Sequence, residues 1–408
     1  MGNPLAASTA RRFPYLLLKL RFFYLATGLA GGLLNPYIGT IFKESGLGDS
    51  AVGLIMACSS VLIVAAQLFW GRLADRYRLT KPILLLSLAV PAALSLLYQA
   101  PSIPVMIAAY MTVVTFTAPQ APISDAYAVP AARAAGSSYG TIRCFQSIGN
   151  ALGGYGAGLF VSTYAPSSLV VPFFLLSCVG IAAVCVLPKQ GAVSVANRSL
   201  SGGISFLLKN REAALFLSAC FLINQTLTAF NTYFVIVFQH AGGSSEWAGT
   251  ALMIAAISNV PSMFLASAVI GRLGLEKTMM IGAMAYIARW AIQYLLPVPS
   301  VMVGVQVLQG LSFGLFYVAA VEYVARLVPA GMQATGQSAF SMVFVGMAGM
   351  AGNLLNGFLL EAGGPSLMNA ACTISAACGA ALLAVIVKGT GSKRSSRASE
   401  SGEMQRDG

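Results

Sequence analysis

The chain has 408 residues, of which 57% are hydrophobic and 9% are charged, and its mean hydropathy is +0.78. Soluble domains carry about 25% charged residues, so this composition excludes an ordinary water-soluble protein. The length accommodates about a dozen membrane spans of roughly 20 residues each. We therefore expect an all-α polytopic membrane protein.

The predicted elements are apolar runs separated by glycine, proline and charge clusters. Arg11 and Arg12 precede the first run, which is too long for the core of a cleavable signal peptide. We expect twelve transmembrane helices, at residues 14–38, 50–70, 82–100, 104–128, 139–163, 169–188, 213–239, 247–271, 277–297, 301–326, 335–361 and 365–388.

The lysine and arginine residues predict the orientation. When the N-terminus is placed in the cytoplasm, the inner loops hold most of the 24 Lys and Arg residues and only Lys43 falls outside. This asymmetry follows the positive-inside rule, so both termini are expected to be cytoplasmic. The cell (plasma) membrane is the default location for such a protein. Contact of this face with anionic lipid accounts for the formal net charge of +12 without a nucleic-acid partner.

The longest internal connection divides the chain into two parts. We expect a cytoplasmic N-terminus at 1–13, six-helix bundles at 14–188 and 213–388, a cytoplasmic linker at 189–212 and a disordered cytoplasmic tail at 389–408, which is too polar to fold.

The two halves repeat the same features in the same order. Gly71-Arg72-Leu73 follows the second run and Gly271-Arg272-Leu273 follows the eighth, while Gly149-Asn150 and Gly352-Asn353 lie in the fifth and eleventh. Such repeats are typical of secondary transporters, whose binding site lies between the repeats near the membrane midplane.

Several chemistries lack the residues that they need. The seven cysteines fall in apolar runs without a C-x-x-C pair, and His240 is the one histidine, so we expect no metal and no cofactor. A P-loop is absent, which argues against an ATP-driven pump. Without paired acids or a nucleophile with its base, an enzyme is not expected.

The loop after the second run reads Gly71-Arg72-Leu73-Ala74-Asp75-Arg76. Asp75 is its one acid, and at a helix end it can meet arginines and a helix dipole, so Gly71, Asp75 and Arg76 are expected to form a gating loop that latches one conformation. The alternative is a solvated basic loop that only follows the topology rule.

Ionisable residues inside membrane spans are costly and indicate functional sites. Asp125, near the inner end of the fourth span, and Arg143, one turn into the fifth, can pair to hold a substrate or to fix the helix register. Arg289, within the ninth span, needs water, an acid or a substrate anion, and Glu322 of the tenth span is its candidate partner. Amides that either line the cavity or bond neighbouring helices are Asn224, Gln225, Asn231, Asn259, Gln309, Asn353 and Asn356.

Three motifs together resemble the lactose-permease-like branch of the major facilitator superfamily: Phe13-Pro14-Tyr15-Leu16, Asn35-Pro36-Tyr37 and the loop from Gly71 to Arg76. The segment from Gln309 to Phe316 is similar to the span-ten pattern of that branch. Its members include oligosaccharide–proton symporters, nucleoside permeases and a phenylpropionate permease. The resemblance covers residues 13–388 and implies two pseudo-symmetric six-helix bundles, the major facilitator fold.

The resemblance also implies roles for individual residues. Asp125 and Arg143 match the acid and arginine that hold sugar in lactose permease, and Arg289 matches an arginine of its proton-coupling machinery. Gln309 stands where that permease has a histidine. Most of the coupling machinery is therefore absent, and any coupled protons must be carried by Asp125 or Glu322.

The expected function is secondary transport of a small polar or anionic organic solute, of the sugar, nucleoside or aromatic acid class, by alternating access with proton-coupled uptake. The alternatives are a drug or metabolite efflux antiporter and a non-transporting sensor or scaffold. The expected partners are the solute, protons and the lipid bilayer, and we expect a monomer.

Overall fold

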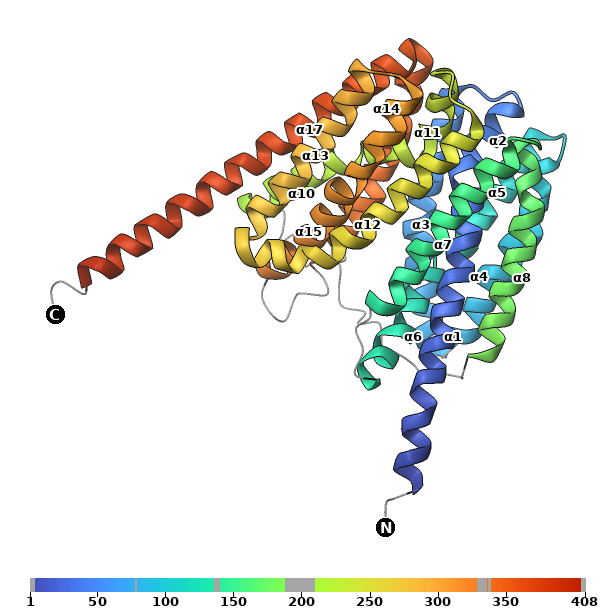
Figure 1. Ribbon diagram of the computed structural model, residues 1–408, viewed down its shortest axis with the longest axis horizontal. Coiled ribbons are helices and arrows are strands. Elements are labelled where there is room, and N and C mark those ends of the chain that lie inside the picture. The colour runs from blue at the N-terminus through green and yellow to red at the C-terminus, as the bar shows by residue number, and fades with distance from the viewer. Residues whose placement is uncertain are drawn as a thin grey trace.

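The computed structural model describes residues 4–77, 79–135, 140–187, 210–328, 336 and 339–404, which form helices joined by short turns with no strand among them (Figure 1). Helices are expected in a membrane, because each backbone polar group must be bonded within its own span. The first half contains α1 (Pro4–Leu34), α2 (Ile38–Glu44), α3 (Asp49–Tyr77), α4 (Thr80–Ser95), α5 (Ile103–Thr117), α6 (Gln120–Ala134), α7 (Gly140–Val161) and α8 (Val170–Val186). The second half contains α10 (Arg211–Asn224), α11 (Leu227–His240), α12 (Ser245–Leu273), α13 (Leu275–Leu295), α14 (Pro299–Gly304), α15 (Phe316–Leu327) and α17 (Ala348–Met404).

Nine helical stretches of the described residues are long and apolar enough to cross a membrane. One of them, Ala339–Lys388, holds two predicted spans, because the backbone leaves helical geometry at Gly363 and Gly364, where φ is −149° and +67°. The predicted fifth and ninth spans are α7 and α13, which have 22 and 21 residues. Neither is apolar enough to be among the nine, since α7 carries Gln146, Asn150 and several glycines and α13 carries Arg289.

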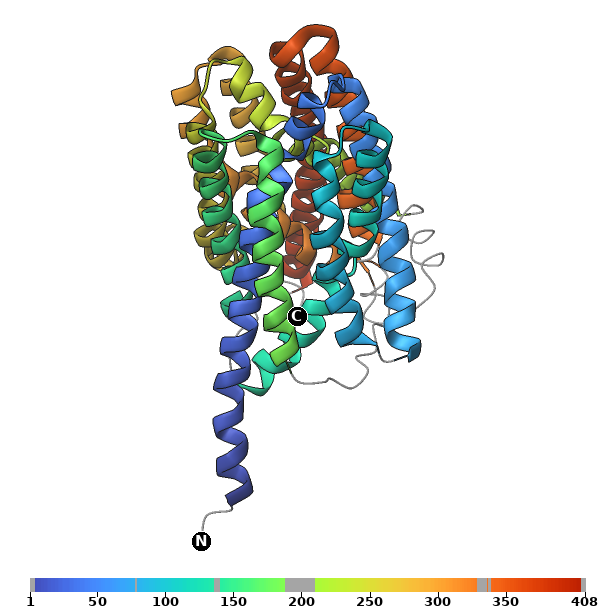
Figure 2. The same cartoon turned by 90° about the vertical axis from the view of Figure 1, so that its right-hand side faces the viewer.

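Beyond the last span, α17 continues through residues 389–404, in the stretch for which a disordered tail was expected. Extending a helix that already exists adds one hydrogen bond per residue and needs no new nucleus. In Figure 1 this end of α17 runs away from the bundle, and in Figures 1 and 2 the start of α1 does the same. We call the end of the molecule at which α1 starts the base, and the opposite end, beside α2, the apex.

The two halves cross at helix pairs that are built on glycine. A Cβ atom added to Gly158 of α7 would lie 2.6 Å from the Cα of Gly249 in α12, and one added to Gly53 of α3 would lie 3.2 Å from the Cα of Gly357 in α17. Small residues permit such close approach of helices. Both crossings lie nearer the apex than the base.

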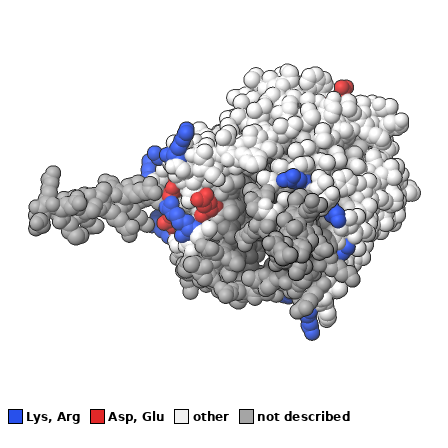
Figure 3. All heavy atoms as spheres, turned by 60° about the horizontal axis from the view of Figure 1, so that its bottom comes forward, with Lys and Arg blue, Asp and Glu red and all other residues white. Residues whose placement is uncertain are grey.

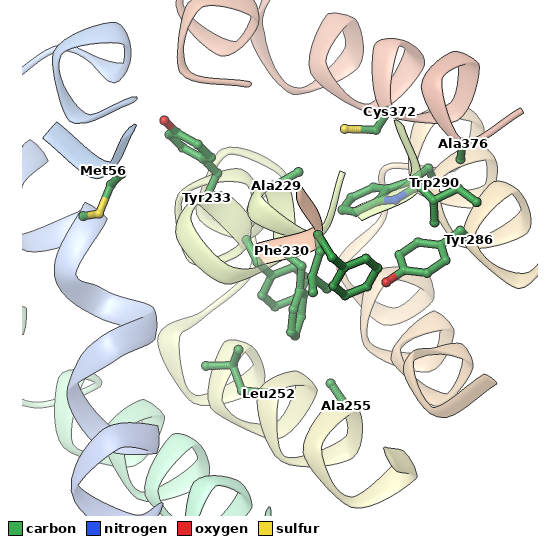
Figure 4. Close-up of a cluster of buried hydrophobic side chains, with 14 of the residues drawn as sticks. Met56, Ala229, Phe230, Tyr233, Leu252, Ala255, Tyr286, Trp290, Cys372 and Ala376 are labelled. Carbon is green, nitrogen blue, oxygen red and sulfur yellow. The ribbon is translucent and has the colours of Figure 1, made fainter. Parts of the chain in front are cut away.

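The buried apolar core shows the same asymmetry. One cluster joins both halves: it includes Met56 of α3 together with the second-half residues Tyr233, Phe230 and Leu252 (Figure 4). A second cluster, toward the base, holds only first-half residues among those described, including Trp70. The halves therefore share a core at the apex, whereas they spread apart toward the base, where α6 and α15 lie (Figure 1).

Lysine and arginine side chains are gathered at the base, seen end-on in Figure 3. Exposed basic residues at the base ends of α3, α10, α12 and α13 are Arg72, Arg76, Arg211, Arg272 and Lys277. This distribution is the one that the positive-inside rule describes for a cytoplasmic face.

Candidate functional site

An ion pair lies between α6 and α7. The two helices are consecutive and joined by a short link, so Asp125 and Arg143 face each other, with Arg143 Nη1 3.6 Å from Asp125 Oδ1. Tyr24 of α1 donates its hydroxyl hydrogen to Asp125 Oδ1 at 2.6 Å, and the Arg143 guanidinium lies 5.8 Å from the centre of the Tyr24 ring. The two charged side chains are 37% and 41% exposed, so a solute can reach them.

The pair faces the second half of the molecule. Tyr317 of α15 lies close enough to interact electrostatically with both Asp125 and Arg143. On α7, Gln146 and Asn150 follow Arg143 at one-turn spacing on the same face. Gly28 and Gly32 of α1 lack side chains, so α1 packs directly against the backbone of Gln146 and Asn150. The face of α7 from Arg143 to Asn150 thus presents one cation and two amides.

A first cavity of about 440 Å³ lies between the halves, bounded by α1, α7, α11, α12 and the start of the π-helical segment Gly310–Leu315. We call this cavity the amide lobe, after the amides that line it: Asn35, Asn150, Asn231, Asn259 and Gln309. Among the described residues its lining includes no acid, lysine or arginine. Three of them were predicted lining residues. Asn35 and Asn150 were missed in that role, although the Asn35-Pro36-Tyr37 motif and the repeat at Gly149-Asn150 had marked both positions.

A second cavity, of about 360 Å³, extends from the same stretch of α1 into the first half. It shares Gly31 and Asn35 with the amide lobe. Hydroxyl groups dominate its polar lining, which includes Thr27, Ser59, Ser60, Ser87, Tyr98, Tyr110, Thr117, Ser177 and Thr232. The Tyr98 hydroxyl is buried and has no hydrogen-bond partner within the described part of the chain. We call this cavity the hydroxyl lobe. Thr232 belongs to the second half, and the other hydroxyl residues named above belong to the first half.

Asn353 of α17 closes the hydroxyl lobe against the second half. Its Oδ1 accepts a hydrogen bond from Thr232 at 2.9 Å, and its Nδ2 donates to Ser60 Oγ of α3 at 3.4 Å. Asn353 therefore both lines the cavity and bonds neighbouring helices across the halves. Asn224, in contrast, is buried and donates to the carbonyl of Phe344, which makes it a structural link.

Arg289 is fully buried in α13, and the prediction that Glu322 is its partner is wrong. Its Nη1 donates to Gln309 Oε1 and its Nη2 donates to Gln306 Oε1 at 2.6 Å, while the Phe230 ring centre lies 4.4 Å from the guanidinium carbon. Glu322 is exposed toward the base. It follows Gln309 by thirteen residues, about 20 Å along a helix, which is too far for it to reach the depth of Arg289.

The residues of the predicted gating loop, Gly71, Asp75 and Arg76, lie at the C-terminal end of helix α3 and not in a loop, because the helix continues to Tyr77, and they are described only in part. A Cβ atom on Gly71 would meet open space, and the Arg76 guanidinium lies 5.5 Å from the centre of the Tyr77 ring. The side chain of Asp75 lies outside the described residues, so the latch stays a prediction. Among the described residues no group of histidine, cysteine and acid side chains could hold a metal ion.

The chain matches the MFS_1 like family over residues 15–369. It is 30% identical to the maltose permease of Geobacillus stearothermophilus over 360 residues, which cover 86% of this chain and 90% of the permease. It is 26% identical over 346 residues to the uncharacterized transporter YwbF of Bacillus subtilis (strain 168), covering 84% of this chain and 86% of that protein.

Solved structures share the fold at lower identity. The crystal structure of the nucleoside transporter NupG superposes with a TM-score of 0.77 and 17% identity, covering 91% of this chain and 98% of NupG. The expected twelve-helix architecture of two bundles is thus confirmed. These relatives and neighbours are transporters, which bears out the expectation that the chain is not an enzyme.

Proposed function

Because this chain belongs to the MFS_1 like family of major facilitator transporters, we propose that it takes up an uncharged, hydroxylated solute of the sugar class together with protons. The observation that carries this proposal is the lining of the two lobes. The polar side chains that line one lobe are amides and those that line the other are mostly hydroxyls, and neither lining includes an acid, a lysine or an arginine among the residues that the structure describes. Amides and hydroxyls can each donate to and accept from the hydroxyls of such a solute.

The surroundings of Arg143 and Arg289 favour a neutral solute over an organic acid. A carboxylate needs an accessible cation that is not already neutralised. Arg289 is fully buried behind Gln309, and Arg143, although a solute can reach it, is paired with Asp125. The lobes, at about 440 and 360 Å³, fall within the range of small-molecule sites, about 300–1,000 Å³. The relative that is 30% identical is a maltose permease, which agrees with a sugar.

The transport cycle that we propose is alternating access between two bundles, at 14–188 and 213–388, in the plasma membrane. In this cycle the base, where lysine and arginine are gathered, is the cytoplasmic face and holds both termini. The apex is the outer face. The halves share a core at the apex and spread apart at the base, which supports assigning the structure to the inward-open state of this cycle. Opening the apex would require the glycine crossings to separate.

Asp125 is the group that we propose to carry the proton. It lies beside Arg143 and Tyr24 on the path between the lobes and the base, whereas Glu322 is exposed at the end of its helix. Asp125→Asn should therefore abolish accumulation against a gradient but retain exchange of labelled for unlabelled solute. Glu322→Gln is the matched control and should accumulate solute as the wild type does. Equal accumulation by Asp125→Asn would remove Asp125 from the coupling step.

The substrate class is tested by equilibrium binding to the purified protein, with maltose, uridine and 3-phenylpropionate as probes. We expect maltose to bind and 3-phenylpropionate not to compete. Asn231→Leu should weaken maltose binding about tenfold, because leaving a solute hydroxyl unpaired costs about 1–3 kcal/mol. Gln67→Leu, at an exposed amide of α3 that lines neither lobe, should bind normally. Binding of 3-phenylpropionate without maltose would refute the sugar class.

A further inference from the structure

We propose that Arg289 is a positioning residue that locks the side-chain amide of Gln309 in one orientation, so that Gln309 offers the solute a hydrogen-bond donor. The cavity then recognises a solute hydroxyl through one fixed donor. This inference rests on the proposed function, because it names what the amide lobe recognises.

Arg289 determines which end of the Gln309 amide faces it. A guanidinium carries only donors, and Arg289 gives Nη1 to Gln309 Oε1 and Nη2 to Gln306 Oε1 at 2.6 Å. With no exposed surface, Arg289 has no water to replace these bonds, and the Phe230 ring covers it at 4.4 Å. A flipped Gln309 amide would place two sets of donors against each other. Its oxygen therefore stays on Arg289.

The two glutamines use their amide nitrogens differently. Gln306 is fully buried, and its Nε2 donates to the carbonyl of Met302 at 2.8 Å, so both ends of its amide are used within the protein. Gln309 lines the amide lobe, beside Asn259. With its oxygen held by Arg289, the Gln309 NH₂ group is left for the lobe. Polarisation of the amide by the cation makes that NH₂ group a stronger donor.

Asn259, next to Gln309 in the lining, keeps its amide within the protein. Its Nδ2 donates to the carbonyl of Ala255 one turn earlier at 3.2 Å, and its Oδ1 is buried, 3.3 Å from where a Cβ atom on Gly314 would lie. The fixed donor that faces the lobe is therefore the NH₂ group of Gln309. A solute hydroxyl can accept a hydrogen bond from it.

The decisive variant is Gln309→Glu, which keeps the size and the acceptor for Arg289 but removes the NH₂ group. We expect its thermal stability without solute to equal or exceed that of the wild type, because the contact with Arg289 becomes an ion pair. We expect maltose binding to weaken at least tenfold. Wild-type affinity in this variant would mean that Gln309 only accepts a hydrogen bond from Arg289 and does not donate to the solute, and would overturn the inference.

Gln306→Glu is the matched control, since it makes the same change beside the same arginine but away from the lobe. It should gain the same ion pair with Arg289 but lose the bond to Met302, so it should be less stable than Gln309→Glu, and it should leave the affinity of the folded protein unchanged. The stability comparison needs no substrate: a Gln309→Glu protein less stable than the wild type would overturn the inference by itself. If the wild type binds uridine and not maltose, the sugar assignment fails, and the same variants are measured with uridine, whose ribose also carries hydroxyls.

Discussion

A single methyl group at the crossing of α7 and α12 should shift the equilibrium between the two halves. A Cβ atom on Gly158 would lie 2.6 Å from the Cα of Gly249 and 2.7 Å from the carbonyl oxygen of Ser245. Carbon atoms in contact are separated by about 3.5–4.0 Å, so Gly158→Ala requires the helices to part by about an ångström. Such overpacking costs about 1–3 kcal/mol, and a state in which the apex has opened avoids it. The ratio of apex-open to apex-closed protein should therefore rise about 5- to 150-fold.

The shift can be measured as a distance across the apex. Tyr164 and Trp247 are 57% and 55% exposed and belong to different halves, so cysteines at these positions, in a background without the native cysteines, accept spin labels. The Gly158→Ala protein should show a larger population at the longer distance.

Gly156→Ala is the control for this experiment, because its Cβ would meet open space on the same helix. It should leave the distance distribution as in the wild type. Identical distributions for Gly158→Ala and the wild type, or equal shifts in both alanine variants, would refute the steric reasoning.

Three further predictions concern charged groups. Arg143→Lys should impair solute exchange while the protein stays folded, because a point charge cannot replace the guanidinium fork beside Asp125; exchange at the wild-type rate would exclude the fork from the mechanism. The Glu361 carboxylate of α17 accepts a hydrogen bond from the Ser50 N–H of α3 at 2.7 Å. Glu361→Ala should therefore favour the apex-open state in the spin-label assay, with a smaller shift than Gly158→Ala. An unchanged distance distribution would show that this bond does not hold the apex closed. Asp75→Asn should slow turnover with little change in equilibrium affinity, and unchanged turnover would count against the latch.

The fold and the ion pair were predictable because they depend on short-range patterns. Apolar runs indicated the spans, and a short link between consecutive helices brings Asp125 to Arg143. The wrong partner for Arg289 has a different cause. The π-helical segment Gly310–Leu315 and the depth of each side chain are set by packing, so the sequence did not reveal that Gln306 and Gln309 lie level with Arg289 while Glu322 does not.

The hydroxyl lobe was missed because its residues look ordinary in a membrane helix. Serine and threonine in spans commonly bond to a carbonyl of their own helix, as Ser60 does with Met56 at 3.0 Å. Only the packing of α1, α3, α4, α5 and α8 shows that several of them line one cavity. The contact between Glu361 and Ser50 at the apex could not be predicted from the sequence either, since it joins residues 311 positions apart.

The central claim, proton-coupled uptake of a sugar-class solute, is tested most directly in proteoliposomes with an imposed inward proton gradient. We expect maltose to accumulate, and an uncoupler to abolish that accumulation while exchange continues. Equilibration of maltose that ignores the gradient would contradict proton coupling and identify a facilitator. Transport of uridine or 3-phenylpropionate in place of maltose would contradict the substrate class.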